Sequence, residues 1–184
     1  MKVWLNMIFY QATWLTCVIG AGRGSWWPGL LVLAVFASWQ LIVSPWPRAD
    51  ACLAVIVSVI GFMLDSTFAH YGAMRFETVV PWAGFAPIWM VALWTSFALT
   101  LNHSLAFLQR RMLLAALLGA IGAPLAYWAA SRGWHALTFP DDPLVVIATT
   151  AVAWAVLMPG LARLALKLRA LDVASRYTIA SVKP

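Results

Sequence analysis

Charged residues are scarce in this chain. They make up 10% of its 184 residues, and only six residues are Asp or Glu. A soluble domain carries roughly 25% charged residues, so this chain cannot cover a water-facing surface. Instead, 64% of the residues are hydrophobic and the mean hydropathy is +0.86. The composition excludes a soluble globular protein and indicates an integral membrane protein.

Cysteines and signature motifs are also few. Cys17 and Cys52 are the two cysteines, and we expect them near opposite membrane faces, where they cannot form a disulfide with each other. No Cys-x-x-Cys pair, P-loop, Gly-x-Ser-x-Gly elbow or dinucleotide fingerprint occurs, so no cofactor is expected. A metal site is not expected either, because His103 is predicted near one membrane face and His70 and His135 near the other.

Long apolar runs are abundant. Each is about 18 residues or longer and can cross a hydrocarbon core of roughly 30 Å. The predicted spans are residues 3–21, 27–44, 51–69, 87–107, 111–131 and 143–164. Asp50 is the expected N-cap of the third span, and Asp142 that of the sixth, with Pro143 at its first position. We therefore expect an all-α single domain of six transmembrane helices, followed by a basic tail over residues 165–184 that continues as a surface helix.

The connections between the spans are short, with one exception. Residues 70–86 form the long connection, and the segment VVPWAGFAP is predicted to be interfacial or re-entrant. At the start of the chain, Asn6, Gln11 and two tryptophans suit a retained span better than a cleaved signal peptide.

The basic residues are distributed unevenly over the predicted topology. The side that holds both termini carries Lys2, Arg48, Arg110, Arg111, Arg163, Lys167, Arg169, Arg176 and Lys183, which are nine of the 12 basic residues. The other side carries Arg23, Arg75 and Arg132, together with Asp65, Glu77, Asp141 and Asp142. The positive-inside rule then places both termini in the cytoplasm. Anionic lipid headgroups account for the net charge of +6, so membrane lipids rather than nucleic acid are the expected partners.

Polar residues within the spans are the candidates for function, because they are costly at membrane depth. Helical spacing allows one cluster at inner-leaflet depth, made of Asn6, Tyr10, Gln11, Gln40, Asn102 and His103. These groups either hydrogen-bond between helices as packing contacts or line a cytoplasm-facing cavity for a lipid-soluble molecule. His103 is one candidate acid/base residue within this cluster.

Asp65 is the second candidate acid/base residue. It ends the run GFMLD in the outer part of the third span, at a depth similar to that of Tyr127. Tyr127 can donate a hydrogen bond to it, and Arg23, Arg75 or Arg132 can reach it from the surface. Asp65 is therefore either a paired carboxylate that fixes helix packing or a proton-handling or substrate-orienting group.

Small and aromatic residues add two further expectations. The segment LGAIGAPLAYW, residues 118–128, combines glycines that let another helix approach closely with a proline that can kink the span. Most tryptophans fall near the predicted interfaces. Trp14, Trp39, Trp94 and Trp154 lie deeper, where they either line a cavity or face lipid.

Four segments of the chain resemble a known family. These are NMIFYQATWLTCVIGAGRG, GFMLDS, PIWMVALWTSFALTLNHSLAFL and LLGAIGAPLAYWAA, and over about residues 5–135 they are similar to the domain-of-unknown-function 2878 family. The resemblance carries over Asn6, Gln11, Trp14, Asp65, Trp89, Trp94, Phe97 and Asn102. Ala123 stands where the family pattern has a glycine before Pro124. The resemblance implies a small multi-pass protein of the bacterial inner membrane, in a setting of genes for fatty-acyl modification, and it supplies no reaction.

Three classes of function remain open from the sequence. The first is a non-enzymatic component, accessory to a lipid-modification or stress-response system, with another membrane protein or a second copy of the chain as partner. The second is an intramembrane enzyme that acts on a lipid-soluble substrate through Asp65 or His103. The third is a small carrier or channel, against which the lack of an inverted repeat counts. Short loops and the absence of a cofactor motif favour the first.

Overall fold

Helices dominate the structure in the order that the apolar runs predict. The computed structural model describes residues 1–140 and 142–182, with side chains described to residue 175. Its α-helices are α1 Lys2–Gly22, α2 Trp27–Val43, α3 Pro47–His70, α4 Ile88–Leu101, α5 Met112–Trp134 and α6 Pro143–Val182. A 3₁₀ helix, η1 Ala106–Arg110, and two short strands, β1 Arg75–Phe76 and β2 Leu137–Thr138, complete the fold. The predicted all-α fold is confirmed, while Asp141, Lys183 and the side chain of Arg176 lie outside the description.

Four of the helices are long and apolar enough to cross a membrane. They are α1, α3, α5 and α6 as far as Ser175, with mean hydropathies of 1.2 to 2.1 over their best windows. Helices α2 and α4 are apolar but have 17 and 14 residues. At about 1.5 Å per residue, α4 extends about 21 Å, less than a hydrocarbon core. The chain is a membrane protein, and the crossing of all six helices remains a prediction.

Large apolar side chains also cover the outside of the bundle. Examples that are more than half exposed are Leu31, Val35, Val55, Met63, Leu113, Ile121, Leu125, Val152 and Val156. Contiguous exposed apolar surface of this kind marks a protein that faces lipid rather than water.

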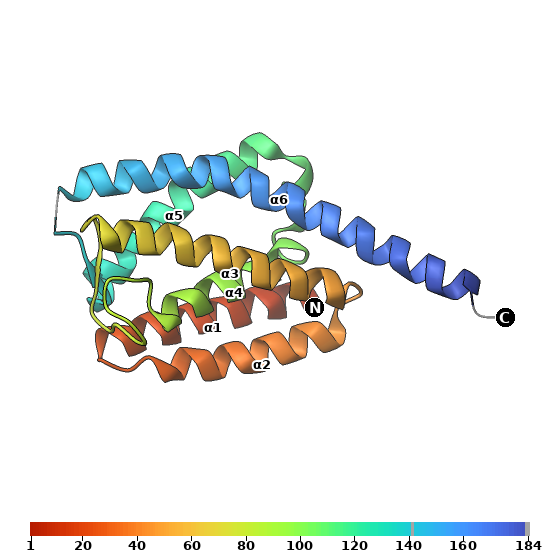
Figure 1. Cartoon of the computed structure of the whole chain (residues 1–184), viewed down its shortest axis with the longest axis horizontal. Coiled ribbons are helices and arrows are strands. Elements are labelled where there is room, and N and C mark those ends of the chain that lie inside the picture. The colour runs from red at the N-terminus through yellow and green to blue at the C-terminus, as the bar shows by residue number, and fades with distance from the viewer. Residues whose placement is uncertain (141, 183–184) are drawn as a thin grey trace.

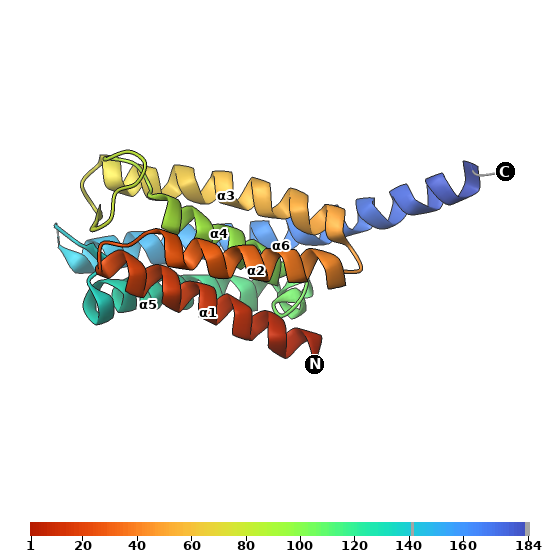
Figure 2. The same cartoon turned by 90° about the horizontal axis from the view of Figure 1, so that it is seen from below.

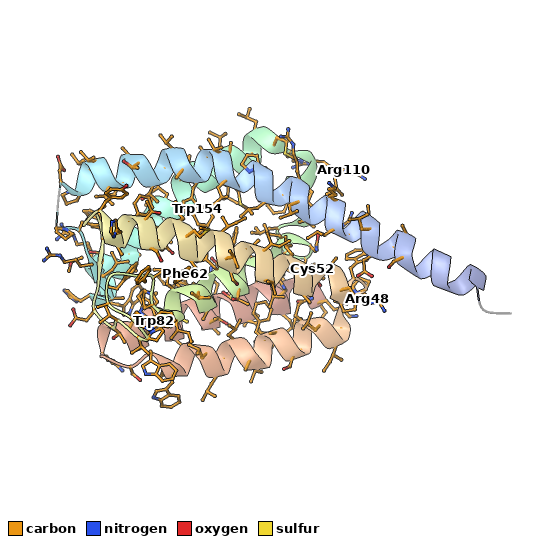
Figure 3. The ribbon with its side chains drawn as sticks, viewed as in Figure 1. Arg48, Cys52, Phe62, Trp82, Arg110 and Trp154 are labelled. Carbon is orange, nitrogen blue, oxygen red and sulfur yellow. The ribbon has the colours of Figure 1, made fainter. Side chains whose placement is uncertain are left out.

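The helices run back and forth between two ends of the bundle. One end, here called the basic end, holds the N-terminus, the turn between α2 and α3, and η1, and Arg48 and Arg110 both lie there (Figure 3). The opposite end, here called the loop end, holds residues 71–87. Helix α6 continues past the basic end as a projecting helix (Figure 1), so the tail leaves the bundle.

Helix α4 occupies the middle of the bundle. It lies between α3 and the α1–α2 pair in both views (Figures 1 and 2), and most of its residues are buried. It ends at Leu101, earlier than the predicted span, because Asn102 and Ser104 bond to other helices rather than continuing the turn. Such side-chain bonds compete with helix continuation.

The start of α3 corrects one expectation. Asp50 is not its N-cap, because the helix begins at Pro47, a residue suited to a first helical position. Asp50 lies in the first turn, where its side chain is buried. The cap assignment from sequence was wrong because the Asp50 carboxylate accepts hydrogen bonds from side chains of other segments and not from the first turn of α3.

The close helix approach predicted near residues 118–128 is present. A Cβ at Gly119 would overlap the backbone carbonyl of Trp154 and the side chain of Met158. Gly119 thus lets α5 pack closely against α6. By contrast, a Cβ at Gly122 would meet nothing, because Gly122 faces open space.

The long connection is fastened to the loop end by hydrogen bonds. Strand β1 pairs with β2 in an antiparallel ladder. Thr78 Oγ1 donates to the carbonyl of Ala21 at 2.7 Å, and Trp89 Nε1 donates to the carbonyl of Thr78 at 3.1 Å. These bonds fix the loop between α1 and α4.

Candidate functional site

A cavity of about 350 Å³ lies between α1, α4, α5 and α6. Its wall is made of Tyr10, Gln11, Trp14, Trp89, Met90, Leu93, Trp94, Phe97, Leu105, Leu118, Gly119, Gly122, Ala123, Ala126, Tyr127, Ala130, Leu137, Trp154 and Met158. None of these side chains is charged. Ligand pockets in proteins are typically about 300–1,000 Å³ and mostly apolar with a few polar groups, so this cavity has the size and chemistry of a small binding site.

The cavity reaches the side of the bundle between α1 and α5. Gln11 on α1 and Leu118 and Gly122 on α5 belong to its wall and are exposed. Toward the loop end, Trp14 closes against Trp134 edge to face, with ring centroids 5.4 Å apart. The opening therefore faces sideways, toward the lipid when the bundle is in a membrane.

Aromatic rings form the inner wall. Trp94 of α4 stacks on Trp154 of α6 with centroids 4.6 Å apart, and Phe97 meets Trp154 edge to face at 5.4 Å. Trp154 projects from α6 toward the interior (Figure 3). Gly61 of α3 makes room for this wall, because a Cβ there would overlap the indole of Trp94.

Asp65 lies behind this wall and does not line the cavity. Tyr127 Oη donates to Asp65 Oδ1 at 2.5 Å, and Trp94 Nε1 donates to Oδ2 at 2.7 Å. The carboxylate is fully buried. The pairing with Tyr127 that the sequence predicts is present. The bond from Trp94 was not predicted, because a tryptophan in an apolar span can face lipid, a cavity or a polar partner and the sequence does not distinguish these.

Three polar side chains of the cavity wall are left without a hydrogen bond among the described residues. They are Tyr10, Gln11 and Trp14, whereas the Nε1 of Trp154 is covered by protein atoms and interacts with Tyr127. Three other polar groups of the wall are paired: Tyr127 and Trp94 donate to Asp65, and Trp89 donates to the carbonyl of Thr78. The cavity therefore offers unsatisfied hydrogen-bonding capacity to a bound molecule.

The other predicted polar residues gather at the basic end. Asn6 Nδ2 donates to Gln40 Oε1 at 2.7 Å and to the carbonyl of Leu99 at 3.0 Å, while Ser104 Oγ donates to Asn6 Oδ1 at 2.5 Å. These bonds join α1, α2, α4 and the turn after α4. The arrangement is that of interhelical packing contacts.

Asp50 is the centre of this end of the bundle, a role that the sequence did not suggest. Asn102 Nδ2 donates to its Oδ1 at 2.9 Å, and Ser44 Oγ donates to its Oδ2 at 2.5 Å. His103 Nε2 lies 2.7 Å from the same Oδ2. Gln109 Nε2 then donates to Asn102 Oδ1 at 3.0 Å. The sequence feature that could have indicated this role is the predicted depth of Asp50, which is the same as that of His103.

The predicted six-residue cluster is thus divided in two. Asn6 and Gln40 bond to each other, and Asn102 and His103 bond to Asp50, all at the basic end. Tyr10 and Gln11 instead belong to the cavity. The two candidate acid/base residues, Asp65 and His103, lie in different networks and do not meet.

Apolar helices around an aromatic cavity that opens sideways define a helical membrane protein with a ligand-sized site. The model of the family described as "Protein of unknown function (DUF2878)" matches residues 3–160, and the chain belongs to this family. The resemblance noted from the sequence is confirmed, and the match spans the whole cavity wall, from Tyr10 to Met158. No curated protein and no solved structure matches the chain.

The family residues carried over from the sequence fall into the regions just described. Gln11, Trp14, Trp89, Trp94 and Phe97 line the cavity, Asp65 lies behind it, and Asn6 and Asn102 lie at the basic end. Ala123, which replaces the expected glycine, also lines the cavity. Five of these eight carried-over residues therefore form the cavity wall.

Proposed function

We propose that the protein is a non-enzymatic membrane component that binds a lipid-soluble molecule between α1, α4, α5 and α6. The cavity of about 350 Å³ is the observation that carries this proposal. Its side opening lies between two exposed apolar helix faces, so its ligand would arrive from the bilayer. At the lower end of typical pocket sizes, it would hold a small molecule or one end of a longer lipid.

The position of Asp65 favours binding over catalysis at this site. Both of its oxygens accept hydrogen bonds, and Tyr127 and Trp94 separate it from the cavity. A general base needs to lie within hydrogen-bonding reach of its substrate. In this proposal Asp65 orients the two wall residues rather than reacting.

An intramembrane enzyme remains the second candidate, and one observation favours it. His103 is hydrogen-bonded to buried Asp50 at 2.7 Å, an arrangement that can support acid/base chemistry. A lipid profile that changes on deletion of the gene and is restored by wild type but not by His103→Gln would support it. A small carrier is the third, and solute flux in proteoliposomes would support that one.

The proposal extends to the cellular setting. We place the protein in the bacterial inner membrane with both termini cytoplasmic, because basic residues such as Arg48 and Arg110 gather at the basic end. Membrane lipids would be its surroundings, nucleic acid would not be a partner, and a second copy or another membrane protein would receive the ligand. Holding an apolar molecule is the form of accessory role in lipid modification or stress response that the cavity supports.

Two glycines provide the test of cavity binding. Gly122 and Gly160 both lie in helices with open space at their Cβ positions, but only Gly122 lines the cavity. Organic extracts of the purified wild-type protein, Gly122→Leu and Gly160→Leu are compared by mass spectrometry. We expect an apolar molecule that co-purifies with wild type and Gly160→Leu and falls at least fivefold in Gly122→Leu. Equal amounts in all three would contradict the proposal.

A further inference from the structure

The unpaired polar groups of the cavity wall lie together on one turn of α1. Tyr10, Gln11 and Trp14 make no hydrogen bond among the described residues. Tyr10 and Trp14 are four residues apart and therefore share a face of the helix, and Gln11 lies beside them at the opening. In the rest of the wall the side chains are apolar, or their polar groups are paired or covered. A ligand therefore finds hydrogen-bonding partners on the α1 side.

The hydroxyl group of Tyr10 faces the cavity. The Tyr10 ring lies 6.5 Å from the ring of Phe97, another residue of the wall, measured between centroids. Protein atoms surround the hydroxyl, which makes no hydrogen bond. Its oxygen is nevertheless not covered, because the covered unpaired side-chain atom among the described residues is Trp154 Nε1. An uncovered oxygen that lies deep inside the bundle borders the empty volume that Tyr10 lines.

The chemistry of these groups limits what the ligand can be. A tyrosine hydroxyl both donates and accepts hydrogen bonds, and so does a glutamine amide. A ketone or an ether accepts only, and it would leave the acceptor oxygens of Tyr10 and Gln11 unused. A hydroxyl group donates and accepts through a single oxygen atom, so it can bond to both residues at once.

The depth and the charge of the site limit the ligand further. Gln11 and Gly122, at the opening, lie near the midpoints of α1, which has 21 residues, and α5, which has 23. In a membrane the opening would lie near the bilayer centre, about 15 Å from either headgroup layer. No side chain of the wall is charged, so a phosphate or carboxylate would lose its hydration without gaining a counter-charge. The ligand that fits is uncharged.

We propose that the cavity takes a small, neutral, lipid-soluble alcohol whose hydroxyl group exchanges hydrogen bonds with Tyr10 and Gln11 just inside the opening. The hydrocarbon body of the molecule lies deeper, against the rings of Trp94 and Phe97. This assignment rests on the proposed function and adds the ligand class and the two residues that select it.

Three probes of similar shape test the assignment. They are 2-naphthol, which donates and accepts, 2-methoxynaphthalene, which accepts only, and 2-ethylnaphthalene, which does neither. Their ring suits the aromatic wall. The full chain in detergent is titrated with each probe by calorimetry. Wild type and variants are compared in the same detergent, so the partition of each probe into micelles cancels from the comparison.

Two variants each remove one of the proposed bonds. We expect Tyr10→Phe and Gln11→Leu each to weaken 2-naphthol about fivefold, the usual net effect of one hydrogen bond. The methoxy compound should lose affinity in at most one of them, and 2-ethylnaphthalene should change less than twofold in both. Tyr71→Phe is the matched control, because Tyr71 is exposed at the loop end and does not line the cavity. Thermal unfolding checks that each variant is folded, and if one does not fold, the other decides.

The outcomes distinguish the two proposals. If neither variant weakens 2-naphthol, or if both weaken 2-methoxynaphthalene as much, the alcohol assignment is overturned and cavity binding remains. Gly122→Leu should weaken all three probes, and Gly160→Leu none. Binding of none of the probes to wild type, or binding that Gly122→Leu does not change, overturns both proposals.

Discussion

The two polar regions of the bundle differ in how fully their hydrogen-bonding groups are paired. At the basic end, both oxygens of Asp50 are used by side chains from other segments. In the cavity wall, Tyr10, Gln11 and Trp14 make no hydrogen bond among the described residues. Both regions lie inside an apolar bundle, where polar groups are costly to bury.

This difference in pairing suggests a structural role for the basic end and a binding role for the cavity wall. A fully paired network stabilises one arrangement of helices and leaves nothing for a ligand. Unpaired groups in a cavity do not stabilise the empty protein, and in the proposed function they would bind the ligand. Substitutions at the basic end should therefore change stability, and substitutions in the cavity should change ligand binding.

The largest effect is expected at Asp50. In Asp50→Ala, Ser44, Asn102 and His103 lose their shared acceptor, and the free energy of unfolding should fall by about 2–4 kcal/mol, since each lost bond costs about 1 kcal/mol or more. Unfolding by SDS titration in detergent measures it. Asp50→Asn keeps one acceptor oxygen and should lose about half as much. If neither variant is destabilised, the hydrogen bonds to Asp50 do not stabilise the folded bundle.

A second effect contrasts two glycines of α5. Gly119→Ala forces a Cβ into the Trp154 carbonyl and should destabilise by about 1–3 kcal/mol, as overpacking does. Gly122→Ala points into open space and should stabilise by about 0.5–1 kcal/mol, because alanine favours a helix over glycine. Thermal unfolding of both variants measures these changes. Effects of the same sign would contradict the difference in packing between Gly119 and Gly122.

The smallest effect contrasts two tyrosines. Tyr127→Phe removes a hydrogen bond to buried Asp65 and should cost about 1–2 kcal/mol. Tyr10→Phe removes a hydroxyl that has no partner among the described residues and should change stability by less than about 0.5 kcal/mol. Equal losses in the two variants would show that the hydroxyl of Tyr10 is not free.

Much of the fold follows from the apolar runs. The predicted segments 3–21, 27–44 and 111–131 become α1, α2 and α5, with ends within three residues of those predicted. Composition decides these helices, because few polar residues interrupt them. The start of α3 and the end of α4 were missed, because both depend on side chains that bond across the bundle.

The site was foreseen in part. Depth along the helices predicted the Asp65–Tyr127 pair, because α3 and α5 both run from the basic end to the loop end and the two residues lie a similar number of residues into them. Of the four deep tryptophans, Trp14, Trp94 and Trp154 line the cavity, whereas Trp39 packs against Phe9. The cavity itself was beyond the sequence, because an empty volume depends on how neighbouring helices pack and not on any one residue.

Photolabelling tests the central claim most directly. Wild-type protein in lipid vesicles is irradiated with an apolar diazirine probe, and the labelled peptides are mapped by mass spectrometry. We predict labels concentrated on the cavity-lining parts of α1 and α5, near Gln11 and Gly122, that are lost in Gly122→Leu and kept in Gly160→Leu. Labels spread evenly over exposed residues such as Leu113 and Val152, and unchanged by Gly122→Leu, would contradict a ligand site in this cavity.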